Sequence, residues 1–69
     1  MSPETTFAAR LTALREAAGL SQYRLARDIG VSRQYISALE LGERDRPSFE
    51  VLCAIADALG VDVGRLRVD

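Results

Sequence analysis

Glycines and small polar residues divide the chain at regular intervals, and this pattern restricts the possible folds more than any other feature. Each of four glycines ends an apolar stretch with helical spacing, and a small polar residue opens the next stretch. The glycines are Gly19, Gly30, Gly42 and Gly60, and the polar residues are Ser21, Ser32, Ser48 and Asp62. Glycine suits the position after a helix because it adopts positive φ, and Ser or Asp before a helix accepts hydrogen bonds from its first amides. The pattern therefore predicts a series of short helices.

Five helices fit between these signals. They are expected near residues 3–18, 22–29, 33–41, 48–59 and 63–66. Ser2 followed by Pro3 is the predicted start of the first helix, because proline suits the first helical position. No stretch alternates apolar and polar residues at every second position, so we expect no sheet. The predicted fold class is all-α, in a single domain that covers residues 1–69.

Apolar residues recur at steps of three and four in these helices, which gives each helix one apolar stripe. The predicted core consists of Phe7, Leu11, Leu14, Ala18, Leu25, Ala26, Ile29, Val31, Ile36, Leu39, Phe49, Leu52, Ile55, Ala56, Leu59, Val61 and Leu66. A chain of 69 residues buries only about 60% of its unfolded surface, so these side chains are expected to form one compact core.

The residue types that the chain lacks exclude most catalytic and metal sites. The sequence has no histidine and one cysteine, Cys53. Zinc sites and Ser-His-Asp or Cys-His catalysis therefore lack the residues that they need. We expect no enzyme activity, no cofactor, no metal and no small-molecule ligand, and we interpret Cys53 as a small hydrophobic side chain.

The sequence also indicates where the protein works. No apolar stretch reaches the roughly 20 residues that a membrane-spanning helix needs. The N-terminus lacks the basic and apolar regions of a secretory signal. We therefore expect a cytoplasmic protein with no membrane partner.

Charge is unevenly distributed along the chain. The net charge of −1 argues weakly against a nucleic-acid partner. Residues 21–39, however, contain three arginines and one aspartate, which is a local charge of 3 − 1 = +2. All nine basic residues are arginine. Arginine binds phosphate and guanine through paired hydrogen bonds, although genomic base composition would also explain this usage.

The second and third predicted helices have the features of a helix-turn-helix. Ala26 is small enough for the two helices to cross closely, and Gly30 allows positive φ in the turn. Val31 follows the turn and can point inward, while Ile36 and Leu39 lie one turn apart on the buried side of the second helix. In this motif the second helix lies in the major groove of DNA.

Several short motifs in order resemble the phage-repressor-like (Cro/C1-type, XRE-like) helix-turn-helix family. They are Leu-Arg-Glu-Ala-Ala-Gly-Leu-Ser-Gln (14–22), Leu-Ala (25–26), Ile-Gly-Val-Ser (29–32), Ile-Ser-Ala-Leu-Glu (36–40), Arg-Pro-Ser (46–48) and Ala-Leu-Gly-Val (58–61). The resemblance extends from about Phe7 to Leu66. It implies a compact five-helix lambda-repressor-like domain that binds specific double-stranded DNA, commonly as a dimer.

Within this motif, the exposed face of the third helix is expected to read bases. The candidates are Arg33, Gln34, Ser37 and Ala38. Arginine can bond guanine, and glutamine can bond adenine, through two hydrogen bonds each. Ala38 could contact a thymine methyl group or only permit close approach. A solvated helix face is the alternative interpretation of all four residues.

The helix-turn-helix also needs hydrogen-bond donors to the DNA backbone. The candidates are Gln22, Ser32, Tyr35, Arg44 and Arg46. The resemblance assigns a phosphate contact to Gln22, at the start of the second helix. Alternatively, Ser32 acts only as a helix cap, Tyr35 only covers a helix surface, and the two arginines pair with the acidic residues of their loop.

Two structural features complete the prediction. The resemblance implies an internal ion pair between Arg15 and Glu40. Leu41, Val63 and Val68 are apolar residues without a predicted place in the core, and we expect them to form a homodimer interface. The predicted function is a transcriptional regulator, a repressor that binds a palindromic operator as a dimer. The alternative is an antitoxin-like or other protein-interaction module that binds a partner protein.

Overall fold

The computed structural model describes residues 6–44 and 47–67, and these residues contain helices and no strands. The elements are α1 (Phe7–Ala17), α2 (Gln22–Ile29), α3 (Arg33–Leu41), α4 (Phe49–Leu59) and the 3₁₀ turn η2 (Val63–Arg65). The all-α prediction is confirmed. None of the helices in the described ranges is long and apolar enough to cross a membrane.

Local hydrogen bonds define the starts of α2, α3 and α4. The hydroxyls of Ser21, Ser32 and Ser48 each accept a bond from the backbone amide three residues later, at 2.9, 3.1 and 3.4 Å. Gly30 and Gly42 end α2 and α3 with φ of 80° and 77°, which side chains other than glycine rarely adopt. The predicted helices at 22–29 and 33–41 are therefore confirmed with their bounds.

The predicted start of the first helix is wrong. Thr6 has an extended backbone, with φ −98° and ψ 151°, and its hydroxyl accepts a hydrogen bond from the Ala9 amide at 3.1 Å. This cap starts the helix at Phe7, whereas proline was expected to start it at position 3. Ser2 and Pro3 themselves lie outside the described residues.

The last helix is shorter than predicted. Residues 63–65 form a single 3₁₀ turn, and the side chain of Asp62 makes no capping hydrogen bond. Asp62 therefore occupies the predicted cap position, with an extended backbone, but its side chain does not cap the turn. One reason for the shorter helix is Gly64 in the middle of the segment, because glycine loses more backbone freedom in a helix than other residues.

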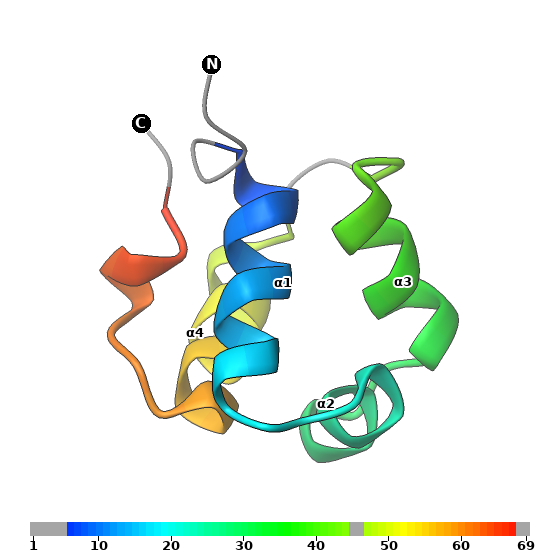
Figure 1. Ribbon diagram of the computed structural model, residues 1–69, viewed down its shortest axis with the longest axis horizontal. Coiled ribbons are helices and arrows are strands. Elements are labelled where there is room, and N and C mark those ends of the chain that lie inside the picture. Colours follow the sequence, from blue (N-terminus) through cyan, green and yellow to red (C-terminus); the bar gives the residue numbers. More distant parts are fainter. Residues whose placement is uncertain (1–5, 45–46, 68–69) are drawn as a thin grey trace.

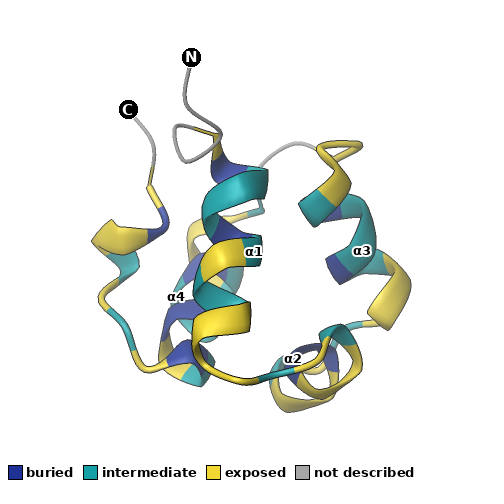
Figure 2. Cartoon of the chain, viewed as in Figure 1, coloured by how far each residue is buried: buried dark blue, intermediate teal, exposed yellow. Residues whose placement is uncertain are grey.

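The helices enclose one apolar core. In Figure 1, α1 lies in front of α4, α3 stands to their right, and α2 crosses below. The largest fully buried side chains are Leu11, Leu25, Ile36, Leu39, Ile55 and Leu66, so every element is represented except the 3₁₀ turn itself. Figure 2 shows these buried stretches on the inner sides of the helices and the exposed residues on the outer side of α2 and around the start of α3.

Two residues that we expected in the core are exposed. Phe49 shares the apolar stripe of α4 with Leu52, but 62% of its surface is accessible. Phe49 is the first residue of α4, and none of the described residues covers it enough to bury it. Ala18 follows the end of α1 and is also exposed. Periodicity identified the correct side of each helix, but not how far the neighbouring elements extend over it.

Candidate nucleic-acid interface

The turn between α2 and α3 fixes how the third helix is presented. Ala26 of α2 is 2% exposed, and its carbonyl accepts a hydrogen bond from the Val31 amide at 2.9 Å. This bond spans Gly30, which has a left-handed backbone conformation, and it forms part of the cap that ends α2. Because Ile36 is fully buried, the opposite face of α3 is directed away from the core.

The four predicted base-reading residues lie on two successive turns of α3. Arg33 and Gln34 are the first two residues of the helix, and both are exposed. Ser37 and Ala38 lie one turn later and are half-buried. The first turn of α3 is therefore the most accessible part of this face, and it carries the two side chains with the greatest capacity to bond base edges.

Gln22 of α2 contacts the predicted reading face, which is the side of α3 that carries Arg33, Gln34, Ser37 and Ala38. Its side-chain nitrogen donates to Glu40 Oε1 at 3.0 Å, and its side-chain oxygen accepts a bond from Arg33 at 3.4 Å. The amide of Gln22 is thus held between a buried carboxylate and the first arginine of α3. Since a side-chain amide has two N–H groups, the bond to Glu40 uses only one of the two donors of Gln22.

Arg15 and Glu40 lie in contact beneath Gln22. Arg15 Nε is 2.6 Å from Glu40 Oε2, Arg15 Nη2 is 3.1 Å from Glu40 Oε1, and Arg15 Nη1 donates to the Leu20 carbonyl at 2.8 Å. The two side chains are only 12% and 6% exposed. This paired bond joins the end of α1 to the end of α3.

Each member of this pair stabilises the charged form of the other. The hydrogen bond to Glu40 raises the pKa of Arg15 above its ordinary value, against the opposing effect of burial. Burial alone would raise the pKa of Glu40, but bonds from Arg15 and Gln22 and the charge of Arg15 outweigh it and hold this pKa below its usual value. Glu40 is therefore ionised at neutral pH, and its bonds support a structural role.

The other predicted phosphate contacts surround α3. The Ser32 hydroxyl caps α3, and Tyr35 is half-buried against the core. The guanidinium of Arg44 lies over the Tyr35 ring, 5.2 Å from its centre, which is the geometry of a cation–π contact. This contact places Arg44 close to the C-terminal end of α3. Arg46 lies outside the described residues.

Two residues beside the reading face were not among our sequence candidates. Tyr23 and Arg27 of α2 border, together with Arg33 and Gln34, a surface hollow of about 470 Å³. Tyr23 is 62% exposed. The sequence places Arg27 and Arg33 on either side of the Gly30 turn, which could have indicated this surface. Only the packing of α2 against α3 shows that the two arginines border the same hollow.

The proposed dimer residues lie in different environments. Leu41 is 68% exposed at the end of α3. Val63 is partly buried and packs against the core, so it offers less free surface than expected. Val68 lies outside the described residues.

This arrangement defines an all-helical DNA-binding domain of the helix-turn-helix class, with a supported reading helix and arginines around it. The profile of the helix-turn-helix family matches residues 11–66, and the chain belongs to this Cro/C1-type, XRE-like family of DNA-binding regulators. No significant match to a curated protein sequence was found.

Solved structures agree with this assignment. The restriction-modification controller protein C.AhdI from Aeromonas hydrophila is 38% identical, with a TM-score of 0.82, over 88% of this chain and 91% of that chain. The clp gene regulator ClgR from Corynebacterium glutamicum is 30% identical, with a TM-score of 0.81, over 96% of this chain and 84% of that chain. A structure of CoII HppE in complex with Tris buffer is also 30% identical, with a TM-score of 0.82, and this chain covers 37% of it.

Proposed function

We propose that the protein is a cytoplasmic, non-enzymatic transcriptional repressor that binds a palindromic operator as a homodimer. The observation that carries this proposal is the exposed pair Arg33 and Gln34 in the first turn of a buttressed α3. The similarity to C.AhdI and ClgR, a controller protein and a gene regulator by their titles, supports a regulatory role. A dimer that occupies a promoter excludes other proteins from the same groove, which is the simplest route to repression.

In the proposed complex, α3 lies in the major groove and its first turn reads the bases. Arg33 bonds a guanine and Gln34 bonds an adenine, each through two hydrogen bonds. Ser37 and Ala38 face the next base step, where a small side chain allows close approach. Gln22, Ser32, Tyr35, Arg44 and Arg46 hold the flanking phosphates, which fixes the register of the helix.

We expect selection from a random pool of duplex DNA to enrich a specific sequence at low salt. Affinity for that duplex should fall linearly on a log–log plot against salt, with a slope of about −0.9 for each phosphate neutralised and about three phosphates for each subunit. Fluorescence anisotropy of the selected duplex at several salt concentrations measures the slope. If no sequence is enriched, the DNA-binding proposal is wrong and a protein-interaction module becomes the better interpretation.

The proposed dimer uses apolar surface near both ends of the segment that joins α3 to α4. Leu41 ends α3 and Phe49 begins α4, and the two side chains are 68% and 62% exposed. Exposed aromatic and aliphatic side chains are typical of interface centres. Phe49 therefore joins Leu41, Val63 and Val68 in the proposed interface. A two-fold axis would place two reading helices on half-sites about 10 base pairs apart.

Replacing Leu41 by glutamate should lower cooperative binding to the palindrome by about tenfold, because the two-fold axis brings two like charges together. Affinity for a single half-site should remain nearly unchanged. Half-site and palindrome titrations, with sedimentation of the free protein, measure both quantities. Ala13→Glu adds the same charge on the exposed face of α1 and serves as the control. Equal effects of the two variants on the palindrome would contradict the proposed interface.

A further inference from the structure

The hollow beside the reading face brings together cationic and hydrogen-bonding side chains from two helices. Its volume is about 470 Å³, and its polar lining consists of Tyr23, Arg27, Ser32, Arg33 and Gln34. The two remaining lining residues are apolar. Two of the polar side chains are guanidinium groups, and none of the described residues that line the hollow carries a carboxylate. The lining is therefore suited to an anion.

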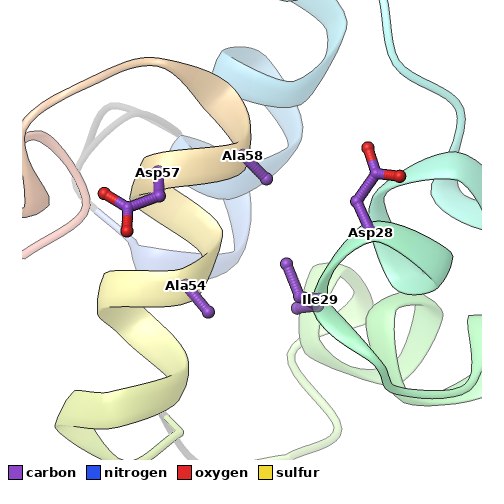
Figure 3. Close-up of a pocket in the computed structure, with 5 residues that line it drawn as sticks. All are labelled: Asp28, Ile29, Ala54, Asp57 and Ala58. Atoms are coloured by element: carbon purple, nitrogen blue, oxygen red, sulfur yellow. The ribbon is translucent and has the colours of Figure 1, made fainter.

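Arg27 is only weakly paired with the one carboxylate beside it. Arg27 Nη2 is 3.7 Å from Asp28 Oδ1, while Asp28 Oδ2 is 3.4 Å from Arg24 Nε. Arg27 is 57% exposed, and exposed pairs of this kind contribute little stability. Figure 3 shows that Asp28 lies, with Ile29, at a different hollow, between α2 and α4. One carboxylate cannot neutralise two arginines, so positive charge remains at the hollow beside α3.

This hollow is continuous with the surface that we propose for DNA binding. Ser32 is a proposed backbone contact, and Arg33 and Gln34 are the proposed base readers. When the second helix of a helix-turn-helix lies in the major groove, the first helix crosses the DNA backbone. DNA bound by α3 would therefore bring a phosphate close to the side of α2 that carries Tyr23 and Arg27.

On the basis of the proposed function, we propose that Arg27 and Tyr23 bind one phosphate group of the DNA backbone at this hollow. The Arg27 guanidinium neutralises the phosphate through paired hydrogen bonds, and the Tyr23 hydroxyl donates a further bond. The backbone also covers part of the Tyr23 ring, which is 62% exposed in the free protein. Together with Arg44 and Arg46, Arg27 brings the arginines at phosphates to the three expected for each subunit.

The test introduces single methylphosphonate groups, which lack the negative charge of a phosphate, along the selected duplex. At one position this group should weaken wild-type binding about fivefold, the upper range for an exposed ion pair. At that position Arg27→Ala should show no further loss, because the two changes remove the same interaction. Arg27→Ala should also weaken binding to every duplex and make the salt slope shallower by about 0.9. Tyr23→Phe should weaken binding about threefold without changing the slope, because it removes only a hydroxyl.

Arg24→Ala is the matched control. Arg24 is 55% exposed, lies on the same helix and pairs with the same carboxylate as Arg27, but it does not line the hollow. This variant should retain the wild-type affinity, salt slope and methylphosphonate pattern, and circular dichroism checks that all variants remain helical. If the two arginine variants change DNA binding alike, or if no methylphosphonate position is coupled to Arg27, the phosphate contact is wrong and the proposed function is unaffected. If the wild-type protein binds no duplex, both the proposed function and this contact are wrong.

Discussion

Replacing Arg15 by methionine should lower the free energy of unfolding by about 3–5 kcal/mol, the cost of removing one member of a buried ion pair. Methionine preserves much of the aliphatic volume but leaves the Glu40 carboxylate, only 6% exposed, without its main partner. The Gln22 amide supplies one remaining bond to Glu40 and cannot neutralise the charge. Small domains have about 5–15 kcal/mol of stability in total, so the loss is a large fraction of it. Urea unfolding followed by circular dichroism measures the change.

Two further variants separate the ion pair from general effects of losing an arginine. Arg24→Met removes an exposed arginine whose nearest carboxylate is 3.4 Å away, and it should cost about 1 kcal/mol or less. The double variant Arg15→Met/Glu40→Leu should recover much of the lost stability, because an apolar pair avoids the cost of burying a single charge. Similar losses for Arg15→Met and Arg24→Met would show that the pair between α1 and α3 does not hold the fold together.

Replacing Arg33 by alanine should weaken binding to the selected DNA sequence by about 1–3 kcal/mol and remove the preference at one base pair. Arg33 is exposed in the first turn of α3, and its guanidinium donates to the Gln22 side chain at 3.4 Å. In the proposed complex, its loss removes a bidentate contact to one base edge and leaves the rest of α3 in place. Affinities for a panel of duplexes, each changed at one position, measure the preference.

Arg44→Ala is the comparison for this experiment. Arg44 is held over the Tyr35 ring at the other end of α3, where we propose a phosphate contact. Its removal should weaken binding to all duplexes alike and make the salt slope shallower by about 0.9, the contribution of one phosphate. If the two variants lose affinity equally for every sequence, the proposed division between base reading and backbone contact is incorrect.

Much of this fold follows from short-range features of the sequence. Ser21, Ser32 and Ser48 cap helices through amides only three residues away, and Gly30 ends α2 through its own φ. These interactions are contained within one helical turn, which is why local patterns predict them. The positions of Arg33 and Gln34 at the start of α3 follow from the same signals, and their exposure follows from the burial of Ile36 on the opposite face.

Other features depend on which elements meet and how far each extends. The stripe of α4 predicted a buried Phe49, but burial depends on what covers the first turn, and Phe49 remains 62% exposed. The bond from Gln22 to Glu40 joins residues 18 positions apart, and the bond from Arg15 to Glu40 joins residues 25 positions apart. The sequence by itself therefore determined α2, α3, the turn between them and the exposure of the first turn of α3. Tertiary packing alone decided how the reading face is supported and which residues of α2 lie beside it, because contacts between distant residues depend on the mutual arrangement of whole helices.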